Sequence, residues 1–427
     1  MQYQAKGLRY IKNSCKIVLT FRFSIPDDRM GDYVTFAGKQ RLMSSRNILF
    51  ISSWYPDRIT RSNGDFVKRH AQAAAIGNRV AVLYVKYDPA MKPGKEIQET
   101  GDGNFSEVII YFNILSGLFS GIRKIIQYYR IYFQGYRYIR KQYFDPELVH
   151  ANITYPIGIL ALLYRWRYGK QYIISEHWSA YLAENHSKLT FSRKLIDRFV
   201  VRRSSMILPV TRNLRDSLDR LGFRTNYAVI PNVVDVGKFS PLEEASGSRT
   251  FIHLSTLNDP VKNISGMLQA TAKLSQKRQD FRLEIIGIEN VEKHRQLARE
   301  LGILGSFVRV EEEIDHKEVP ERLRKSMCLL MFSNFESLPV IIIEALASGI
   351  PVISSDVGGI KEYISAQEGI LVPKQNIDAL TGAMDYMLDR HNDYTKEHLA
   401  EHALKNFSPE AIGPQLDSIY ESVLTHG

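Results

Sequence analysis

The stretch CLLMFSNFESLPVIIIEALASGIPVISSDVGG (328–359) contains an apolar strand, a helix and a second strand in direct succession. The helix must end at Gly349, because Pro351 cannot continue it. Buried strands joined by helices form parallel sheets that carry helices on both faces. Two carboxylates, Glu336 and Glu344, interrupt this apolar stretch. Because glutamate is rarely buried without a partner, each is either at the surface or committed to a partner.

The same alternation of short apolar runs and helical patterns continues along most of the chain. We expect strands in two sets, at 47–56, 79–87, 147–152, 171–177, 206–211 and 227–235, and then at 250–257, 281–288, 306–312, 328–334, 351–356 and 369–373. A further helix should open at Pro156. This pattern predicts an α/β fold of two doubly wound, Rossmann-like domains that face each other across a cleft.

The domain boundaries follow from the same pattern. We expect a basic N-terminal extension at 1–42, a first Rossmann-like domain at 43–232 and a second Rossmann-like domain at 233–405. A closing helix at 406–427 should cross back to the N-terminal domain.

The composition indicates a globular protein of a reducing compartment. The chain has 427 residues, 44% hydrophobic and 24% charged, which is enough for at least two domains. Its two cysteines, Cys15 and Cys328, form neither a disulfide framework nor a spaced metal set. The apolar tract at 148–164 is too short and too interrupted to span a bilayer, and 11–23 lacks the apolar core of a signal peptide. We therefore expect a cytoplasmic protein.

The net charge of +10 is unevenly distributed. Residues 1–232 contain 36 Lys and Arg against 17 Asp and Glu, whereas 233–427 contain 20 against 29. A basic half commonly faces an anionic surface, either nucleic acid or the inner leaflet of a membrane. Nothing in the sequence resembles a base-stacking platform or a nucleic-acid recognition module, so we exclude nucleic acid as a partner.

A basic, aromatic helix at 121–144 favours the membrane. One face of it is predicted to carry Ile122, Ile125, Ile126, Tyr129, Tyr132, Phe133 and Tyr136, and Arg and Lys supply most of the remainder. Such a helix suits the interface of a bilayer. We expect peripheral contact with the inner face of an anionic membrane. The alternative is a helix packed on its own domain with a solvated basic edge.

The quoted stretch also predicts an anion site. Glu336 lies just beyond the end of a strand, where open α/β sheets bind ligands, and Ser337 is predicted to cap a helix that has Pro339 in its first turn. The start of that helix offers free N–H groups to a phosphate. A phosphate site flanked by two hydroxyl acceptors, Glu336 and Glu344, is what a nucleotide sugar requires.

The sequence resembles the family-4 glycosyltransferases of the GT-B fold, retaining enzymes of bacterial polysaccharide and glycolipid synthesis. The resemblance rests on Glu336 and Glu344 as a Glu-x7-Glu motif, on EALASGIPVISSDVGG after it, and on ISEHWSAY (174–181), PVTRNLRDSL (209–218), IPNVVD (230–235), KNISGMLQA (262–270) and NFSPEAIGPQLDSIYESVL (406–424). It implies a retaining hexosyltransferase with Glu336 at the donor sugar and Glu344 at the ribose hydroxyls. It also implies that the N-terminal domain at 43–232 is the acceptor side and that the C-terminal domain at 233–405 binds the nucleotide sugar. The implied acceptor is lipid-linked or a saccharide.

Five further positions complete the expected donor site, and three of them have a structural alternative. The resemblance implies that His177 binds the donor sugar near the reacting carbon, although a lone histidine is more often structural. Gly64 would let the backbone approach a diphosphate, or is an ordinary turn glycine. Lys262 would meet the diphosphate, or lies at the surface. Ser337 and Leu338, beside Glu336, belong to the same predicted donor site.

One departure from the family pattern affects the diphosphate contacts. The family has Gly-Arg-Leu before the lysine, whereas this chain has Ser255-Thr256-Leu257. Either Lys262 and the helix start suffice, or another basic residue takes the place of the missing arginine. No Asp-x-Asp motif or His/Cys cluster has metal-ligand spacing, so we expect a metal-independent reaction with no cofactor beyond the nucleotide sugar.

Three rival functions use the same fold. A nucleotide-sugar 2-epimerase would not need a membrane helix, and a phosphorylase would need a lysine placed for pyridoxal phosphate, for which there is no motif. The third rival is a protein that binds a nucleotide sugar without catalysis, which the missing arginine at Thr256 favours.

Overall fold

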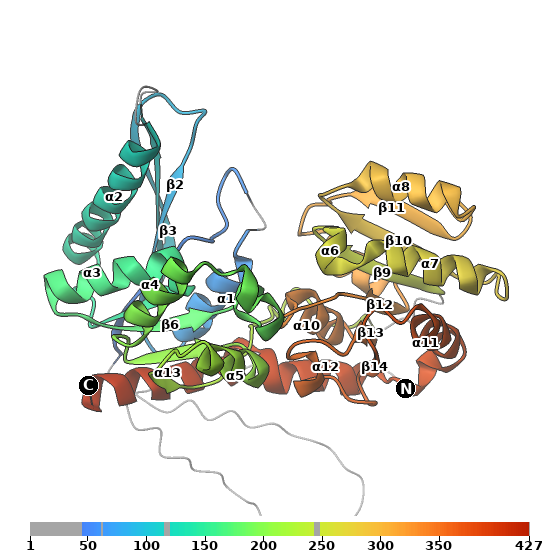
Figure 1. Cartoon of the computed structure of the whole chain (residues 1–427). Helices are drawn as coiled ribbons and strands as arrows, with labels where there is room; N and C mark the ends of the chain where they lie inside the picture. Colours follow the sequence, from blue (N-terminus) through green and yellow to red (C-terminus); the bar gives the residue numbers. More distant parts are fainter. Residues whose placement is uncertain (1–44, 61–62, 115–119, 243–247, 427) are drawn as a thin grey trace, which may run out of the picture. The chain divides into compact units, whose positions relative to one another are not determined.

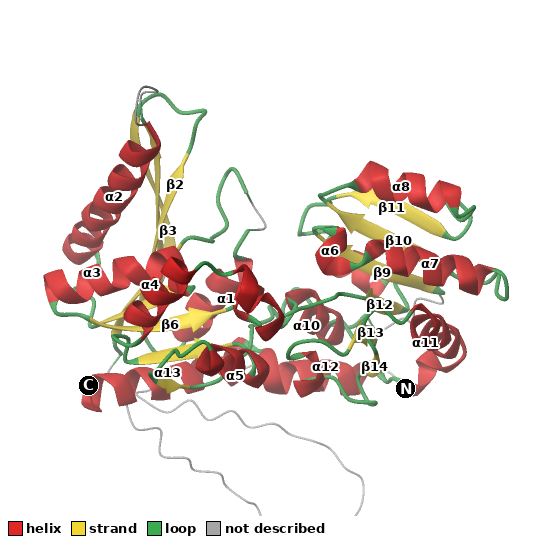
Figure 2. Ribbon diagram, viewed as in Figure 1, coloured by secondary structure: helices red, strands yellow, loops and turns green. Residues whose placement is uncertain are grey.

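The computed structural model describes residues 45–60, 63–114, 120–242 and 248–426, and the predicted extension at 1–42 lies outside them. The described chain contains two open sheets with helices on both faces, which confirms the predicted α/β class (Figures 1 and 2). We call the first sheet with its helices the N-lobe and the second sheet with its helices the C-lobe.

The N-lobe sheet has eight strands. They are β1 Asn47–Ser52, β2 Arg79–Tyr87, β3 Gly94–Asp102, β4 Phe105–Asn113, β5 Leu148–Asn152, β6 Gln171–Glu176, β7 Met206–Pro209 and β8 Asn226–Tyr227. Their order is β3-β4-β2-β1-β5-β6-β7-β8, and all pairs are parallel except the antiparallel pair β3–β4. The central strands β1 and β5 are buried except at Asn47, as expected for a sheet covered on both faces.

Helices cover the two faces of this sheet. The main ones are α1 Asp65–Ala74, α2 Ser120–Gln142, α3 Ile159–Tyr168, α4 Phe191–Val201 and α5 Arg212–Arg220, with short helical turns at Thr154–Gly158, Ser179–Tyr181 and Ala183–Lys188. Residues from α2, α3, α4 and α5 share one core with alternate strand residues such as Leu49 and Leu83. Helix α1 packs on the opposite face, against Ile48 and Phe50. That face is completed by the last helix of the chain, α13 Pro409–His426.

The C-lobe sheet has six parallel strands. They are β9 Thr250–Ser255, β10 Arg282–Gly287, β11 Val308–Glu312, β12 Cys328–Met331, β13 Val352–Ser355 and β14 Gly369–Val372, in the order β11-β10-β9-β12-β13-β14. Its helices are α6 Asp259–Lys262, α7 Ile264–Ser275, α8 Val291–Glu300, α9 Val319–Arg324, α10 Val340–Ala347, α11 Ile377–Arg390 and α12 Lys396–Phe407, with short turns at Ile360–Glu362 and His391–Asp393. Helices α7, α8 and α11 share one core, and α9, α10 and α12 belong to the other.

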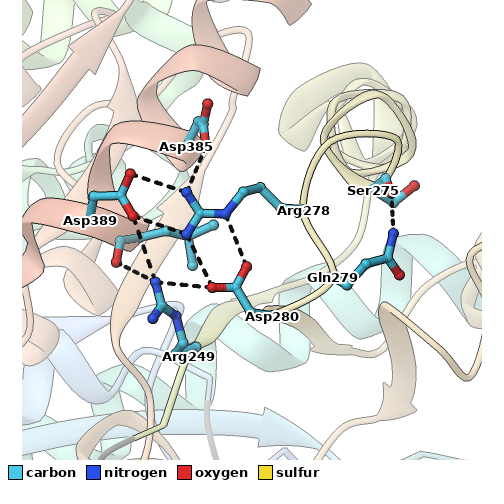
Figure 3. A network of polar contacts seen from close by, with 8 residues as sticks. Arg249, Ser275, Arg278, Gln279, Asp280, Asp385 and Asp389 are labelled. Carbon is cyan, nitrogen blue, oxygen red and sulfur yellow. Dashed lines mark hydrogen bonds and ion pairs between the residues drawn. The ribbon is translucent and has the colours of Figure 1, made fainter.

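A polar network ties the end of α7 to α11 at the edge of the C-lobe (Figure 3). The Arg278 guanidinium donates to Asp280 at 3.0 Å, to Asp385 at 3.3 Å and to Asp389 at 2.9 Å. Arg249 joins it by donating to the Leu388 carbonyl at 2.7 Å. Most of these groups are exposed, so we assign the network to the orientation of α11 and not to chemistry.

Three local predictions were wrong or incomplete. The β3–β4 hairpin was not predicted. Every residue of β3 is exposed and gives no apolar alternation, whereas β4 is a buried apolar strand whose pattern was missed. Of the stretch 227–235, only Tyr227 is in a strand, as the last residue of the two-residue strand β8. Helix α3 begins at Ile159, not at Pro156, because a wider helical turn at Thr154–Gly158 precedes it.

The predicted apolar face of the helix at 121–144 was also wrong in part. Tyr132 and Tyr136 of α2 are fully buried in the N-lobe core, whereas Ile122, Ile125 and Ile126 are exposed. The helix therefore has two adjoining stripes, one packed on the sheet and one facing outward. In the described part of the chain, no helix is long and apolar enough to cross a membrane.

The close packing of α2 on the sheet generates the first prediction. A Cβ atom at Gly135 would lie 2.5 Å from Leu83 Cδ1, whereas one at Gly121 in the same helix would meet no atom within 4 Å. We expect Gly135→Val to lower the free energy of unfolding by about 1–3 kcal/mol through overpacking. Urea denaturation measures this change. Gly121→Val is the matched control, and an equal loss in both variants would show that packing is not the cause.

Candidate active site

Glu336 lies in the loop that leads from β12 to α10 and is only 8% exposed. Lys262, the last residue of α6, places its Nζ 2.5 Å from Glu336 Oε1. The Ser333 hydroxyl donates to the same oxygen at 2.8 Å. Glu336 is therefore not a solvated loop residue, and Lys262 is not a free surface lysine. The carboxylate and the ammonium group can reach the same small ligand.

Two glycines of the DVGG sequence hold this loop in place. Gly358 has a φ of 58°, and a Cβ there would lie 1.7 Å from the Glu336 carbonyl oxygen. The Gly359 N–H donates to the Ser337 carbonyl at 3.2 Å. A side chain at Gly358 would therefore displace the backbone that carries Glu336.

The predicted helix cap at Ser337 was wrong. Helix α10 begins at Val340 with Pro339 as its N-cap residue, and no side chain caps it. A residue that precedes proline is pushed toward the extended conformation, so Leu338 cannot begin a helix. The Ser337 hydroxyl is instead buried without a hydrogen-bond partner among the described residues. Leu338 is also buried, beside the same loop.

Glu344 is buried inside α10 and is paired across the two lobes. Its Oε1 accepts a hydrogen bond from Arg69 Nη2 at 2.6 Å and lies 3.5 Å from His316 Nε2. Burial opposes the charged form, but the positive charges of Arg69 and His316 outweigh it and lower the pKa of Glu344. The hydrogen bond and charge of Glu344 in turn raise the pKa of His316. Glu336 and Glu344 are therefore both buried, and each has a basic partner.

Arg69, in α1 of the N-lobe, is the partner that the sequence did not reveal. Its side chain is 4% exposed, and its Nε donates to Asp65 one turn earlier at 2.6 Å. Despite burial, the two carboxylates raise the pKa of Arg69 further. The Asp65–Arg69 spacing is the one local signal that could have marked this arginine. The Arg69–Glu344 pair itself joins residues 275 positions apart.

Asn232 connects His177 to the loop of Glu336. Its amide nitrogen donates to the Leu338 carbonyl at 2.8 Å, so its oxygen faces His177 Nδ1 at 3.0 Å. His177 Nδ1 must then carry the proton, which leaves Nε2 as an acceptor. Nε2 is buried with no partner among the described residues. Burial holds the pKa of His177 well below its usual range, so the neutral ring offers this lone pair at neutral pH.

Gly64 occupies the turn just before α1. Its φ is 74°, and a Cβ would lie 2.4 Å from the Trp54 carbonyl carbon. The backbone of the loop after β1 thus already requires glycine at this position. A side chain would move the start of α1, which carries Asp65 and Arg69.

The position of the missing arginine is exposed. Thr256 lies at the end of β9 with its side chain at the surface. A different cation, Lys188 of the N-lobe, lies over the Phe335 ring with its Nζ 5.1 Å from the ring centroid. Phe335 is next to Glu336, so Lys188 is a basic residue near the loop that sequence patterns did not single out. Within the described ranges, no group of three or more His, Cys, Asp or Glu side chains could hold a metal ion.

A few direct contacts therefore connect the predicted residues. Lys262 contacts Glu336 directly, Asn232 joins His177 to Leu338, and Arg69 joins Glu344 to α1. The ring of Phe66 in α1 lies 4.6 Å from the His177 ring. Helix α1, which follows Gly64, therefore contacts His177 through Phe66 and Glu344 through Arg69.

The buried Arg69–Glu344 pair generates the second prediction. We expect Arg69→Met to lower the free energy of unfolding by about 3–5 kcal/mol, because it leaves a buried carboxylate without its main counter-charge. Urea denaturation at neutral pH measures the loss. The control is Arg309→Met, which removes an exposed arginine paired with Glu311 and should cost about 0–1 kcal/mol.

The raised pKa of His316 gives the third prediction. A group whose folded pKa exceeds its unfolded value stabilises the fold below the unfolded pKa and loses this effect as pH rises through the folded pKa. Glu344, with its lowered pKa, stays ionised over this range. The Tm difference between wild type and His316→Gln should therefore be larger at about pH 6 than at about pH 8.5. A difference independent of pH would show that protonated His316 does not pair with Glu344.

Comparison with known proteins identifies the two lobes separately. The sequence model "Glycosyltransferase Family 4" matches residues 70–238, and "Glycosyl transferases group 1" matches residues 238–405. The MMP alpha-(1->4)-mannosyltransferase of Mycolicibacterium hassiacum is 26% identical over 201 residues, which cover 46% of this chain and 48% of that protein. The phosphatidyl-myo-inositol mannosyltransferase of Mycobacterium leprae is 27% identical over 208 residues, covering 46% and 54%. The chain thus spans about half the length of these curated relatives.

A solved structure reproduces both sheets. The sucrose-phosphate synthase of Thermosynechococcus elongatus superimposes with a TM-score of 0.72 at 19% identity, covering 90% of this chain and all of that one. At this identity the likeness concerns the fold alone. The sequence matches to both lobes and the shared two-sheet architecture show that the chain belongs to the family-4 glycosyltransferases of the GT-B fold.

Proposed function

We propose that the protein transfers a hexosyl group from a nucleotide sugar to a lipid-linked acceptor, with retention of anomeric configuration and without a metal ion. One observation carries this proposal. In both Glu336 and Glu344, the contacts with neighbouring residues involve Oε1, and among the described residues Oε2 has no hydrogen-bond partner. Each glutamate is thus held in place by a basic group and keeps one oxygen for a hydroxyl of the ligand.

The two glutamates would hold different parts of the donor. Glu336, in contact with Lys262, would accept hydroxyl groups of the transferred sugar, and Glu344 would accept those of the ribose. The unpaired Nε2 of His177 would accept a further sugar hydroxyl on the N-lobe side. Because the pKa of His177 is lowered, this contact does not require a change of protonation at neutral pH.

The leaving nucleoside diphosphate requires positive charge. Lys262 supplies one cation, and the free N–H groups at the start of α10 supply a partial positive charge in the same loop. Lys188, over Phe335, is our candidate for the charge that the family takes from an arginine at the position of Thr256. The exposed Thr256 is also what favours the second candidate function, nucleotide-sugar binding without transfer.

Support for a lipid-linked acceptor comes from residues of α2, outside the proposed donor site. The exposed isoleucines of α2, Ile122, Ile125 and Ile126, share this helix with six Lys and Arg residues and no Asp or Glu. Such a surface suits an anionic membrane. The similar mannosyltransferase of Mycobacterium leprae is named for a lipid acceptor, phosphatidyl-myo-inositol. A protein held peripherally at a cytoplasmic membrane face would meet a lipid-linked acceptor there.

The donor is tested first by thermal shift with a panel of UDP-, GDP- and ADP-sugars. A donor present at about 100 times its Kd stabilises the fold by about 2.7 kcal/mol, so one member of the panel should raise the Tm clearly. Transfer assays with that donor follow. Binding without transfer to any acceptor would support the second candidate function, and no binding at all would contradict both.

The fourth prediction concerns the two groups in contact at the loop. We expect Lys262→Met and Glu336→Gln each to lower kcat by about 10²–10³-fold, since each removes a charge next to the reacting centre. Steady-state kinetics with the identified donor measures the effect. Lys277→Met, which changes an exposed lysine of the C-lobe, is the control and should leave kcat unchanged. A loss of only a few-fold in both site variants would refute their assigned roles.

A further inference from the structure

Helices α3 and α4 present an apolar surface to the outside of the N-lobe. We call it the α3–α4 surface and define it by Trp166, Phe191, Leu195, Ile196 and Phe199, which are 61%, 74%, 47%, 41% and 43% exposed. The Trp166 and Phe199 rings lie 6.2 Å apart, and an apolar hollow of about 410 Å³ lies between the two helices. Monomeric proteins rarely leave large contiguous apolar patches in water, so this surface calls for an occupant.

The rim of this surface is basic. The two helices and the residues that follow α4 contribute Arg165, Arg167, Lys194, Arg198, Arg202 and Arg203. Within the described ranges, none of these six forms an ion pair with a carboxylate, and Arg203 lies over the Phe199 ring at 3.6 Å. The one carboxylate of α3 and α4, Asp197, is buried and bound by Arg193 and Tyr181. The exposed charge of the surface is therefore entirely positive.

This charge distinguishes between two occupants. A second copy of the chain in a two-fold dimer would place the same patch against itself, and the two basic rims would repel each other. An anionic bilayer complements both features at once, because aromatic and aliphatic side chains enter the interface while Arg and Lys meet the headgroups. Charge complementarity therefore favours the membrane.

Helix α2 packs directly beside α3. Phe133 of α2 contacts Tyr164 and Tyr168 of α3, with ring centroids 5.2 and 6.1 Å apart. A second hollow of about 530 Å³ lies along Ile125, Tyr129 and Phe133. In Figure 1, α2, α3 and α4 lie on the same side of the N-lobe. The α3–α4 surface and the exposed stripe of α2 therefore belong to the same helical layer of the N-lobe.

The start of α4 connects this face to the candidate active site. The Arg193 guanidinium lies over the rings of Tyr155 at 3.9 Å and Trp178 at 5.3 Å. Trp178 directly follows His177 and packs edge-on against Trp54 at 6.1 Å. A molecule that emerges from a bilayer at the start of α4 would first meet these aromatic rings and then His177.

We propose that the α3–α4 surface inserts into an anionic membrane, with Trp166 and Phe199 among the acyl chains and the basic rim at the headgroups. The insertion would deliver a lipid-linked acceptor past Trp178 to His177. This purpose of the insertion rests on the proposed function. The binding of lipid itself does not depend on that function, so the two can fail separately.

The test is co-sedimentation of the full chain with phosphatidylcholine vesicles that contain or lack phosphatidylglycerol. We expect binding to the anionic vesicles, release at high salt, and weaker binding to phosphatidylcholine alone. The double variant Trp166→Gln/Phe199→Gln should weaken binding by about tenfold or more, because it removes the inserted side chains. Ile288→Gln/Tyr386→Gln changes two equally exposed apolar residues of the C-lobe and should bind as wild type does.

A second readout locates the inserted side chain. Brominated phosphatidylglycerol should quench part of the tryptophan fluorescence of the wild-type protein, and Trp166→Phe should lose that part. Full binding by the double variant, or unchanged quenching in Trp166→Phe, would overturn the proposal. A wild-type dimer that the double variant dissociates, without any binding to vesicles, would assign the surface to a second copy instead.

The two proposals are separated by activity measured without membranes. Transfer to a short, water-soluble acceptor should be unchanged in the double variant, since neither residue touches the donor site. Vesicle binding by a wild-type protein that binds no nucleotide sugar would leave the membrane surface standing and refute the proposed function. Sugar transfer by a protein that does not bind vesicles would support the proposed function and refute the membrane surface.

Discussion

A carboxylate buried in an apolar helix cannot remain charged without a counter-charge, and Glu344 obtains one from the opposite lobe. Arg69 lies in α1 of the N-lobe and is itself shared with Asp65. Breaking such a buried pair leaves an unpaired charge in the interior, which is far more costly than losing a surface ion pair. The ribose-binding residue of the proposed donor site therefore also holds α1 against the C-lobe.

Several smaller contacts converge on the same junction. Asn232 hydrogen-bonds to His177 on one side and to the Leu338 carbonyl on the other. Glu362 accepts hydrogen bonds at 2.8 Å from the backbone N–H groups of Arg212 and Asn213 at the start of α5. Gly359 fits against Thr211, where a Cβ would lie 2.2 Å from a side-chain carbon. The loops that carry the proposed donor-binding groups are thus positioned by direct contact with the N-lobe.

The two proposals assign separate faces of the N-lobe to separate tasks. The face that carries α1 and α13 contains the buried pair of Arg69 and meets the C-lobe. The face that carries α2, α3 and α4 exposes apolar and basic side chains. A parallel sheet needs helices on both faces to bury its strands. Contacts with the C-lobe come from α1 and from the start of α5, which leaves α2, α3 and α4 available to a membrane. Arg193 of α4 lies over Trp178, which packs against Trp54, and Trp54 in turn packs against Phe66 of α1.

The sequence by itself determined the α/β class, nearly all of the parallel strands and the position of the Glu-x7-Glu motif. Buried parallel strands are continuous apolar runs, and helix ends are marked by residues such as Gly349 and Pro351, so both can be recognised locally. Apart from the apolar strand β4, which was missed, prediction from the sequence failed where the local pattern is absent or ambiguous. The exposed strand β3 has no apolar alternation, and the stripes of α2 could not be divided into a buried and an exposed one.

Only the tertiary structure decided which groups act together. The partner of Glu344 is 275 positions away, the free nitrogen of His177 depends on the orientation of Asn232, and Lys188 reaches Phe335 from the other lobe. The hydroxyl of Ser337 has no helix to cap, because Pro339 keeps the chain extended before α10. The physical reason is the same in each case. Local sequence sets the period and the ends of an element, whereas the charge and hydrogen-bond partners of a buried group are set by whatever the fold packs against it.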